Sequence, residues 1–415
     1  MNRYHAAWVV PIEGEPIRDG WVSVDRGRIV ALGRRAANDA TPGTELGDVA
    51  VMPALVNAHT HLELSYLRDQ IAPASSFTAW ARQIIYARRM KPTDPMALQV
   101  RTDGAIDAAI DECVRCGTAV VGDIGNTHAA FRKIAASPLA GVFFWELIGF
   151  NLPDADFDAI VEHAVGDLQE LPATEKVRVS LAAHAPYSVA PLFFRAIKKA
   201  VNKMPFVPCS VHLAENFEEV ELLMTGGGPW KALMKDIGSW NHAWTAPGVG
   251  PVQYLDQMGF LDNRLLAVHG VQMSLADLET LRTRGVTLVT CSRSNGHTGA
   301  GLPPIADFYE SGVRVAIGTD SLASSPDLNV FAEVSTLHAL APSVAPAALL
   351  ESATIQGARA LGFDADYGSI EPGKLAHLLA VDVPPGTSDV EEYLVSGIHP
   401  GQIRWVEAGW VGRAG

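Results

Sequence analysis

The sequence predicts an α/β fold in which a (β/α)8 barrel of the TIM type carries a small β-sandwich domain built from both ends of the chain. The 415 residues exceed one ordinary domain of ~150 residues, whereas a barrel of ~250 residues with an appendage accounts for the length. Eight apolar segments in the middle of the chain end at polar or reactive residues, with room for crossover helices between them. Short alternating segments of the β type lie at both termini.

The two ends of the chain resemble each other more than either resembles the middle. Residues 21–25 and 28–32 flank a turn at Arg26-Gly27, which is a hairpin pattern. Residues 375–383 and 403–408 show similar short strands near the C-terminus. We therefore expect residues 1–52 and 366–415 to form the β-sandwich, and residues 53–365 to form the catalytic barrel.

The middle of the chain repeats the order strand, loop and helix. Helices are expected, for example, over Pro191–Val201 and Leu275–Arg284. Loops that follow strands build the active face of such a barrel, so we expect the long insertions at 64–100 and 216–260 to cover a pocket as lids, with peripheral packing as the alternative. The eight expected strands end near His59, Asp123, Glu146, His184, His212, His269, Cys291 and Asp320.

The composition excludes several classes of protein. With 48% apolar and 19% charged residues, the chain can bury a large core, which excludes disorder. The net charge of −14 offers no basic surplus for a phosphate backbone, so no nucleic-acid partner is expected. No apolar run reaches the ~18 residues of a membrane span, and four cysteines are too few for a disulfide scaffold. We expect a cytoplasmic protein without a membrane partner, and a homodimer stays open as its assembly state.

Polar residues at the expected strand ends are suited to bind a metal ion. Residues i and i+2 of an extended chain point the same way, so His59 and His61 can converge on one ion. His212, His269 and Asp320 end later strands of the same rim. A single buried His or Asp would be explained as a satisfied core residue, but so many at one rim are costly to desolvate without a common partner. A metal ion is that partner.

These residues resemble the amidohydrolase superfamily, which has H-x-H at strand one, His at strands five and six, and Asp at strand eight. The segment V-H-L-A-E-N at 211–216 is similar to the H-x-A-E segment of its purine and pyrimidine deaminase branch, the ATZ/TRZ-like group with a single metal ion. Residues 368–376 resemble that group's C-terminal return strand, although His377 stands where Asp is usual.

The resemblance implies one divalent ion in the site. Two-metal members bridge their ions with a carboxylated Lys at the end of strand four, and here that place is His184. The implied ligands are His59, His61, His212 and Asp320, with a water completing the set. Zinc suits these ligands, while iron, manganese and cobalt stay open.

The same resemblance implies a hydrolytic deaminase. Such an ion lowers the pKa of its bound water towards ~7, so that hydroxide can attack an amidine-like carbon and ammonia can leave. Glu215 lies three residues beyond a ligand and is suited to protonate the ring nitrogen, the alternative being a helix N-terminal carboxylate. Asp320 would accept the water proton and pass it to ammonia. His269 would orient the nucleophile, stabilise charge or act as a fifth ligand, and His184 resembles a substrate-contacting His.

The motifs at 61–65, 291–295 and 318–324 look most like aminodeoxyfutalosine deaminases of menaquinone biosynthesis, whose substrate carries an adenine, a ribose and a benzoate. An Arg near the mouth would pair with the carboxylate; the candidates are Arg82 and Arg88, for which solvation on a helix is the alternative, and Arg293. Glu63 would bind a ribose hydroxyl or the ring, or would anchor an Arg. The other expected substrate contacts are Ser294 and the aromatic walls Trp80, Trp230, Trp240 and Trp244.

Other activities share the same rim and stay open. They are the deamination of adenosine, methylthioadenosine, S-adenosylhomocysteine or guanine, and the removal of chloride or amines from triazines. A barrel that kept the metal as a binding protein and lost turnover is the non-hydrolytic alternative. Glu215, His269 and Asp320 argue against it, because a binding role needs no proton shuttle.

Overall fold

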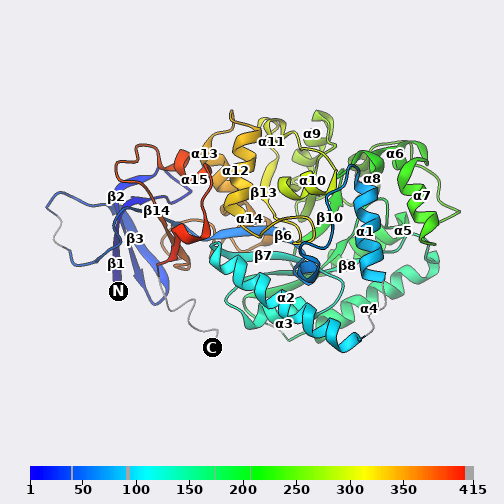
Figure 1. Cartoon of the computed structure of the whole chain (residues 1–415), viewed down its shortest axis with the longest axis horizontal. Coiled ribbons are helices and arrows are strands. Elements are labelled where there is room, and N and C mark those ends of the chain that lie inside the picture. The colour runs from blue at the N-terminus through cyan, green and yellow to red at the C-terminus, as the bar shows by residue number, and fades with distance from the viewer. Residues whose placement is uncertain (39–40, 90–93, 173, 206, 407–415) are drawn as a thin grey trace.

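The computed structural model describes residues 1–415 except 39–40, 90–93, 173, 206 and 407–415. It consists of a seven-stranded sheet at one end of an elongated molecule and an eight-stranded barrel with surrounding helices in the remainder (Figure 1). No helix among the described residues is long and apolar enough to cross a membrane.

The terminal sheet joins strands from both ends of the chain, as the sequence predicts, and these strands form one seven-stranded sheet. Its order is β15-β14-β5-β1-β2-β3, with β4 on β1. The predicted hairpin is present, because Asp25 of β2 pairs with Arg28 of β3 across Gly27, which has a φ of 76°. The strand expected over 403–408 ends at Trp405, and Ala408 lies outside the described residues. The strands are β1 (Asn2–Val9), β2 (Ile17–Asp25), β3 (Arg28–Arg34), β4 (Thr44–Glu45), β5 (Val49–Pro53), β14 (Leu378–Asp382) and β15 (Ile403–Trp405).

The barrel contains the eight parallel strands that the sequence predicts. They follow one another in chain order, and a bridge between Thr60 and Asp320 connects the last strand end to the first. All eight carboxyl ends therefore lie on one rim, which places the expected metal ligands together. The strands are β6 (Leu55–Thr60), β7 (Thr118–Gly125), β8 (Ala140–Leu147), β9 (Val177–Ala183), β10 (Cys209–Leu213), β11 (Leu265–His269), β12 (Thr287–Thr290) and β13 (Arg314–Ile317).

Helices connect the barrel strands as expected. The helices predicted over Pro191–Val201 and Leu275–Arg284 are α5 and α9 with those bounds. The remaining helices are α1 (Phe77–Arg89), α2 (Pro95–Arg115), α3 (Ala129–Ala136), α4 (Phe157–Glu170), α6 (Phe217–Thr225), α7 (Gly228–Asp236), α8 (Pro251–Gln257), α10 (Ser292–Thr298), α11 (Ile305–Glu310), α12 (Val330–Leu340), α13 (Pro346–Ser352), α14 (Ile355–Leu361) and α15 (Val390–Val395), with the 3-10 turns η1 (Leu62–Leu67), η2 (Asp154–Asp156) and η3 (Pro400–Gln402).

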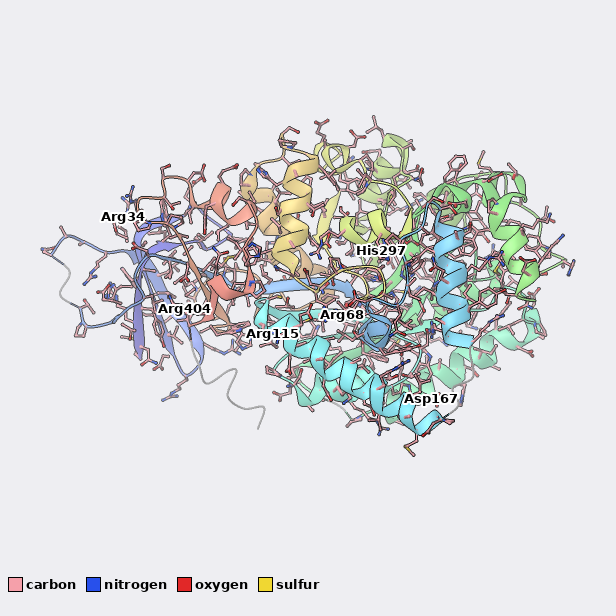
Figure 2. The ribbon with its side chains drawn as sticks, viewed as in Figure 1. Arg34, Arg68, Arg115, Asp167, His297 and Arg404 are labelled. Atoms are coloured by element: carbon pink, nitrogen blue, oxygen red, sulfur yellow. The ribbon has the colours of Figure 1, made fainter. Side chains whose placement is uncertain are left out.

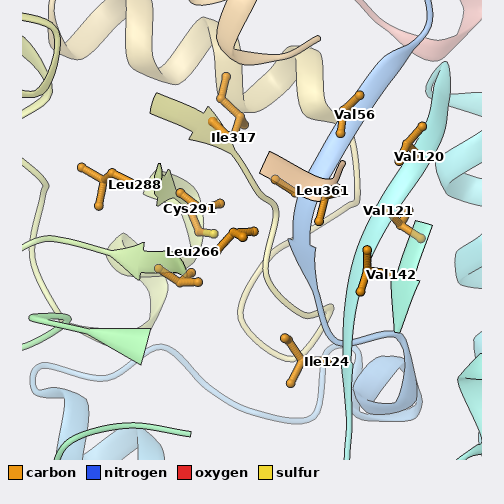
Figure 3. Packing of buried hydrophobic residues seen from close by; sticks show 14 of the residues in the cluster. Val56, Val120, Val121, Ile124, Val142, Leu266, Leu288, Cys291, Ile317 and Leu361 are labelled. Carbon is orange, nitrogen blue, oxygen red and sulfur yellow. The ribbon is translucent and has the colours of Figure 1, made fainter. Parts of the chain in front are cut away.

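The core of the barrel consists of β-branched and aliphatic side chains from its strands. Val56, Val121 and Ile317 come from three different strands and are fully buried in one cluster, with Leu361 of α14 against them (Figure 3). Burial on both faces explains why these strands read as continuous apolar runs in the sequence.

The two long insertions pack against each other on the rim side of the barrel. Phe77 of α1 contacts Trp230 of α7, with ring centroids 5.8 Å apart. The loop before α1 is fixed to the barrel, because Arg68 donates to Glu112 of α2 and the carbonyl of Ile71 contacts His297 of α10 at 3.1 Å. Arg68 and His297 are labelled in Figure 2. This packing places both insertions beside the strand ends where a pocket was expected.

Candidate active site

Four histidines and one aspartate converge at the carboxyl ends of the barrel strands. His61 Nε2 lies 3.3 Å from His212 Nε2 and 3.6 Å from Asp320 Oδ1. His59 Nε2 lies 3.8 Å from the same Asp320 oxygen. The rings of His212 and His269 are stacked with centroids 5.4 Å apart. The structure thus brings together all five residues that the sequence placed at this rim.

The donor set fits a single transition-metal ion. One ligand atom from each of His59, His61 and His212 lies within 4.8 Å of the others. Ligand atoms held at ~2.0–2.2 Å from a tetrahedral ion are roughly 3.3–3.6 Å apart, close to the distances observed here. His59 is fully buried, yet neither ring nitrogen has a hydrogen-bond partner among the described residues. An imidazole left in this way is costly unless an ion takes one nitrogen.

A hydrogen bond on the second ring nitrogen of His212 sets the orientation of this ligand. His212 Nδ1 lies 2.8 Å from the carbonyl oxygen of His184, which fixes the proton on Nδ1 and directs Nε2 to the rim. Burial lowers the pKa of His61 to about 4 and outweighs the charges of Asp320 and Glu146, which act to raise it. Neutral imidazole is the form that binds a metal ion.

The backbone around the ligands has strained φ angles, and the ends of β13 and β6 approach each other closely. His269 and Asp320 lie in the left-handed region with φ of 81° and 58°, which is uncommon for residues with a Cβ and concentrates at functional sites. A Cβ on Gly318 would come 2.8 Å from His59, so only glycine allows β13 to pass this close to β6. Asn57 and Thr319 add paired hydrogen bonds between the same strands.

Asp320 is held by two hydroxyl groups. Ser294 and Ser324 donate to its Oδ2 at 2.6 and 3.0 Å, leaving Oδ1 towards the histidines. Burial acts to raise the pKa of Asp320, but His61, His269 and Ser294 outweigh it, so the carboxylate form is favoured. Ser294 is fully buried behind this ligand. The structure therefore places Ser294 behind Asp320, where its hydroxyl holds the carboxylate, and its expected contact with a substrate stays a prediction.

Glu215 and His269 form a close pair next to the ligands. Glu215 Oε1 lies 3.4 Å from His269 Nε2, and His269 Nδ1 is held at 2.8 Å by the side-chain oxygen of Asn295. Glu219 of α6 accepts hydrogen bonds from the backbone N–H groups of Ala214 and Glu215. Burial, followed by the charges of Asp320 and Glu219, raises the pKa of Glu215 well above its usual value. A buried carboxylic acid of this kind can hold a proton at neutral pH and deliver it to a substrate.

A cavity of about 640 Å³ reaches the rim at His184, a volume within the range of small-molecule sites. His184 Nδ1 lies 2.5 Å from the hydroxyl of Ser188, and burial followed by the charge of His212 lowers the pKa of His184 well below its usual value. Trp80 and Trp230 line the cavity as expected. Trp240 and Trp244 instead pack on Phe150 behind it.

The expected cations of the substrate site lie in different places. Arg88 of α1 lines the cavity, donates to Asn126 Oδ1 at 2.9 Å and lies 3.6 Å from Glu63 Oε1. Glu63 does not line that cavity; Thr127 donates to it twice, and burial raises its pKa. These contacts agree with the alternative in which Glu63 anchors an Arg. Arg82 pairs with Asp236 on the surface.

Arg293 is not placed at the cavity. Its Nη1 donates to Asp327 Oδ1 at 2.8 Å, its Nε lies 3.6 Å from Glu333 Oε1, and its side chain is 12% exposed. These two carboxyl groups already pair with the guanidinium, and the expected pairing of Arg293 with a substrate carboxylate stays a prediction.

Sequence reasoning missed Glu146 and Asn126. Glu146 ends β8 and was identified only as a strand end, yet it lines the cavity beside His184. Asn126 follows β7 and donates from Nδ2 to Glu146 Oε2 at 3.0 Å. The signal available in the sequence was a carboxylate directly at the end of an apolar strand, on the rim that holds the ligands.

Comparison with known proteins agrees with this geometry. The chain is 30% identical over 388 residues to a 5-methylthioadenosine/S-adenosylhomocysteine deaminase of Syntrophobacter fumaroxidans, covering 89% of this chain and 81% of that protein. It is 31% identical over 327 residues to an aminodeoxyfutalosine deaminase of Deinococcus radiodurans, covering 77% and 75%. A crystal structure of an adenosine deaminase from Xanthomonas campestris with bound zinc has a TM-score of 0.76 at 28% identity, covering 97% of this chain and 90% of that one. The model of the amidohydrolase family matches residues 50–404, and the chain belongs to that family.

Proposed function

We propose that this protein is a hydrolytic deaminase of an adenine-type nucleoside that uses one divalent metal ion, with aminodeoxyfutalosine as the favoured substrate. The membership in the amidohydrolase family supports a hydrolase acting on C–N bonds of cyclic amidines. The observation that carries the proposal is the pairing of a complete ligand rim with a buried, proton-holding Glu215 only 3.4 Å from His269.

The chain supplies the ligands and the proton transfers of the proposed reaction. His59, His61, His212 and Asp320 would hold the ion, which when bound supplies an activated water at neutral pH. Zinc suits three imidazoles and a carboxylate, and the related adenosine deaminase contains zinc.

Glu215 would donate its proton to the ring nitrogen of the base, because its raised pKa favours the protonated acid. Asp320, held as a carboxylate by Ser294 and Ser324, would accept the water proton and pass it to the departing ammonia. His269, fixed by Asn295, would orient the attacking oxygen from the other side. The cavity beside His184 would hold the rest of the nucleoside.

Arg88 supports a substrate with a carboxylate. It is a cation on the cavity wall, with its Nη2 bound to the neutral amide of Asn126 and its guanidinium 3.6 Å from Glu63. Its further N–H groups can bind an anionic tail in the cavity, and charge-assisted bonds of this kind are among the stronger ones. Aminodeoxyfutalosine, an adenine nucleoside with a benzoate, provides that anion.

The proposal is tested by ammonia release from a panel of adenosine, methylthioadenosine, S-adenosylhomocysteine, guanine and aminodeoxyfutalosine. We expect the highest kcat/KM for aminodeoxyfutalosine. Loss of a charge-assisted pair costs roughly 1.5–3 kcal/mol, so Arg88→Met should lower that kcat/KM by roughly 10- to 100-fold and change adenosine turnover little. Arg82→Met is the matched control, because Arg82 lies on the same helix and pairs with Asp236 outside the cavity.

Deamination of methylthioadenosine or S-adenosylhomocysteine is the second candidate. The cavity wall around Arg88 is mostly apolar and aromatic, including Phe77, Ile84 and Trp230, and such a wall also suits a thioether. Faster turnover of these substrates than of aminodeoxyfutalosine would refute the favoured substrate and retain the nucleoside deaminase.

A further inference from the structure

Glu146 is a buried carboxylate of the cavity wall that the proposed proton transfers do not use. Its side chain is 3% exposed. Asn126 Nδ2 donates to Glu146 Oε2 at 3.0 Å, and Asn126 Oδ1 accepts from Arg88 Nη2 at 2.9 Å. The two contacts fix the orientation of the Asn126 amide, so Arg88, Asn126 and Glu146 form one hydrogen-bonded row along the cavity.

The second carboxylate oxygen of Glu146 lacks a donor. Among the described residues, Oε1 has no hydrogen-bond partner. Its neighbour His212 Nδ1 is 3.7 Å away, which is too long for a hydrogen bond, and that nitrogen already contacts the His184 carbonyl at 2.8 Å. A buried carboxylate oxygen without a donor is costly. A donor on a bound ligand would remove that cost.

The position of Glu146 indicates which part of a nucleoside would provide the donor. Glu215, which follows β10, and His269, the last residue of β11, would act on the base, whereas Glu146 lies at the end of β8 beyond His184. Arg88, suited to an anionic tail, lies one residue further along the row. The order from the rim outwards is therefore base site, Glu146, Arg88, which matches the order base, ribose, tail in a nucleoside substituted at its 5′ carbon.

We propose that Glu146 Oε1 accepts a hydrogen bond from the 2′,3′-diol of the bound ribose, and so determines specificity for ribonucleosides. This inference rests on the proposed function. In a 5′-substituted nucleoside the 5′ hydroxyl is absent, and the diol carries the remaining sugar donors. A carboxylate with one oxygen held by Asn126 accepts such a hydrogen bond at little cost in side-chain entropy, because Glu146 is already positioned.

The test compares kcat/KM for substrates with and without each ribose hydroxyl, in the wild type and in variants of Glu146. We would assay adenosine, 2′-deoxyadenosine and 3′-deoxyadenosine with the metal-loaded wild type, Glu146→Gln and Glu146→Ala. The control variant is Glu162→Gln, because Glu162 lies on the surface of α4. For the wild type and the control, removal of the bonded hydroxyl should lower kcat/KM by roughly 10- to 100-fold. For Glu146→Ala the ribo- and deoxynucleoside should be used within about threefold of each other, and Glu146→Gln should lie between.

Metal content and nucleoside binding separate the possible failures. We expect unchanged metal content in both Glu146 variants, and calorimetry with the Glu215→Gln enzyme should show weaker binding of the same deoxynucleoside. If the variants keep the full preference for ribose, in turnover or, where the ion is lost, in calorimetric binding, Glu146 only positions its neighbours and the inference is refuted. Equal use of ribo- and deoxynucleosides by an active wild type also refutes it while leaving the proposed function intact. If the wild type deaminates no nucleoside, the proposed function fails first, and absence of nucleoside binding then refutes this inference as well.

Discussion

Replacement of Glu215 by Gln tests the proton transfer at the centre of the proposed reaction. The amide has nearly the shape of the carboxylic acid but cannot deliver the proton to the ring nitrogen. Glu215 is 3% exposed, so water has little access as a substitute donor. The nearest alternative is His269, 3.4 Å away, whose pKa burial lowers to about 4, which leaves it largely unprotonated at neutral pH.

The expected loss in kcat is the full contribution of a positioned acid, about 10²–10⁴-fold, or roughly 3–5 kcal/mol in the barrier. The assay measures steady-state ammonia release, together with metal content and binding of the substrate. Glu218→Gln is the control, because it makes the same chemical change three residues away on a half-exposed side chain of α6. Metal and binding should be unchanged in both variants. If Glu215→Gln kept more than about a tenth of wild-type turnover, Glu215 would be structural and the argument from its raised pKa would be wrong.

Three further predictions concern the ion, the loop of Glu215 and the terminal domain. His61→Asn should lose the ion and activity together, and elemental analysis of the wild type should give one ion per chain; two ions would contradict the single site. Glu219→Gln keeps one acceptor for the N–H groups of Ala214 and Glu215 and leaves the other unpaired, so urea unfolding should show a loss of about 1–3 kcal/mol, with kcat reduced and the ion retained. Burial lowers the pKa of His377 to about 4 from 6.5 in the folded protein. The contribution of His377 to stability is therefore present above the unfolded pKa and is lost as the pH falls towards the folded pKa. Between about pH 7.5 and 5 the wild type should lose about 1–2 kcal/mol of unfolding free energy relative to His377→Gln in urea titrations, and the same loss in both proteins would contradict this.

Much of the fold could be predicted because it depends on local patterns. Buried parallel strands are continuous apolar runs, and the ends of β10 and β11 were correctly located from Val211–Leu213 and Leu265–Val268. The helices α5 and α9 begin at a proline and after a capping serine, signals that propensity and capping explain. Once the eight strand ends are known, parallel geometry alone brings their polar residues to one rim.

The substrate side could not be predicted to the same depth because it depends on pairings between distant residues. The sequence around Arg293 does not reveal its partners, because Asp327 and Glu333 lie 34 and 40 residues away. The link of Arg88 to Glu146 passes through Asn126, which is 38 residues from one and 20 from the other. Such contacts come from the way loops of different barrel units meet, and no local periodicity encodes them.

The backbone conformation of the rim gives a physical reason why this site is held by the barrel and not by the loops. Ala214, His269 and Asp320 all have positive φ, at three strand ends next to or within the ligand set. Each costs of order 1 kcal/mol or more and persists only where the surroundings determine it. Here the determinants are Glu219 on the N–H groups of the Ala214 turn, Asn295 on His269, and the two serines on Asp320. Because each of these three backbone positions has its own fixed support, a change in the insertions that carry Arg88 in α1 and Trp230 in α7 could alter the substrate while the chemistry at the rim is preserved.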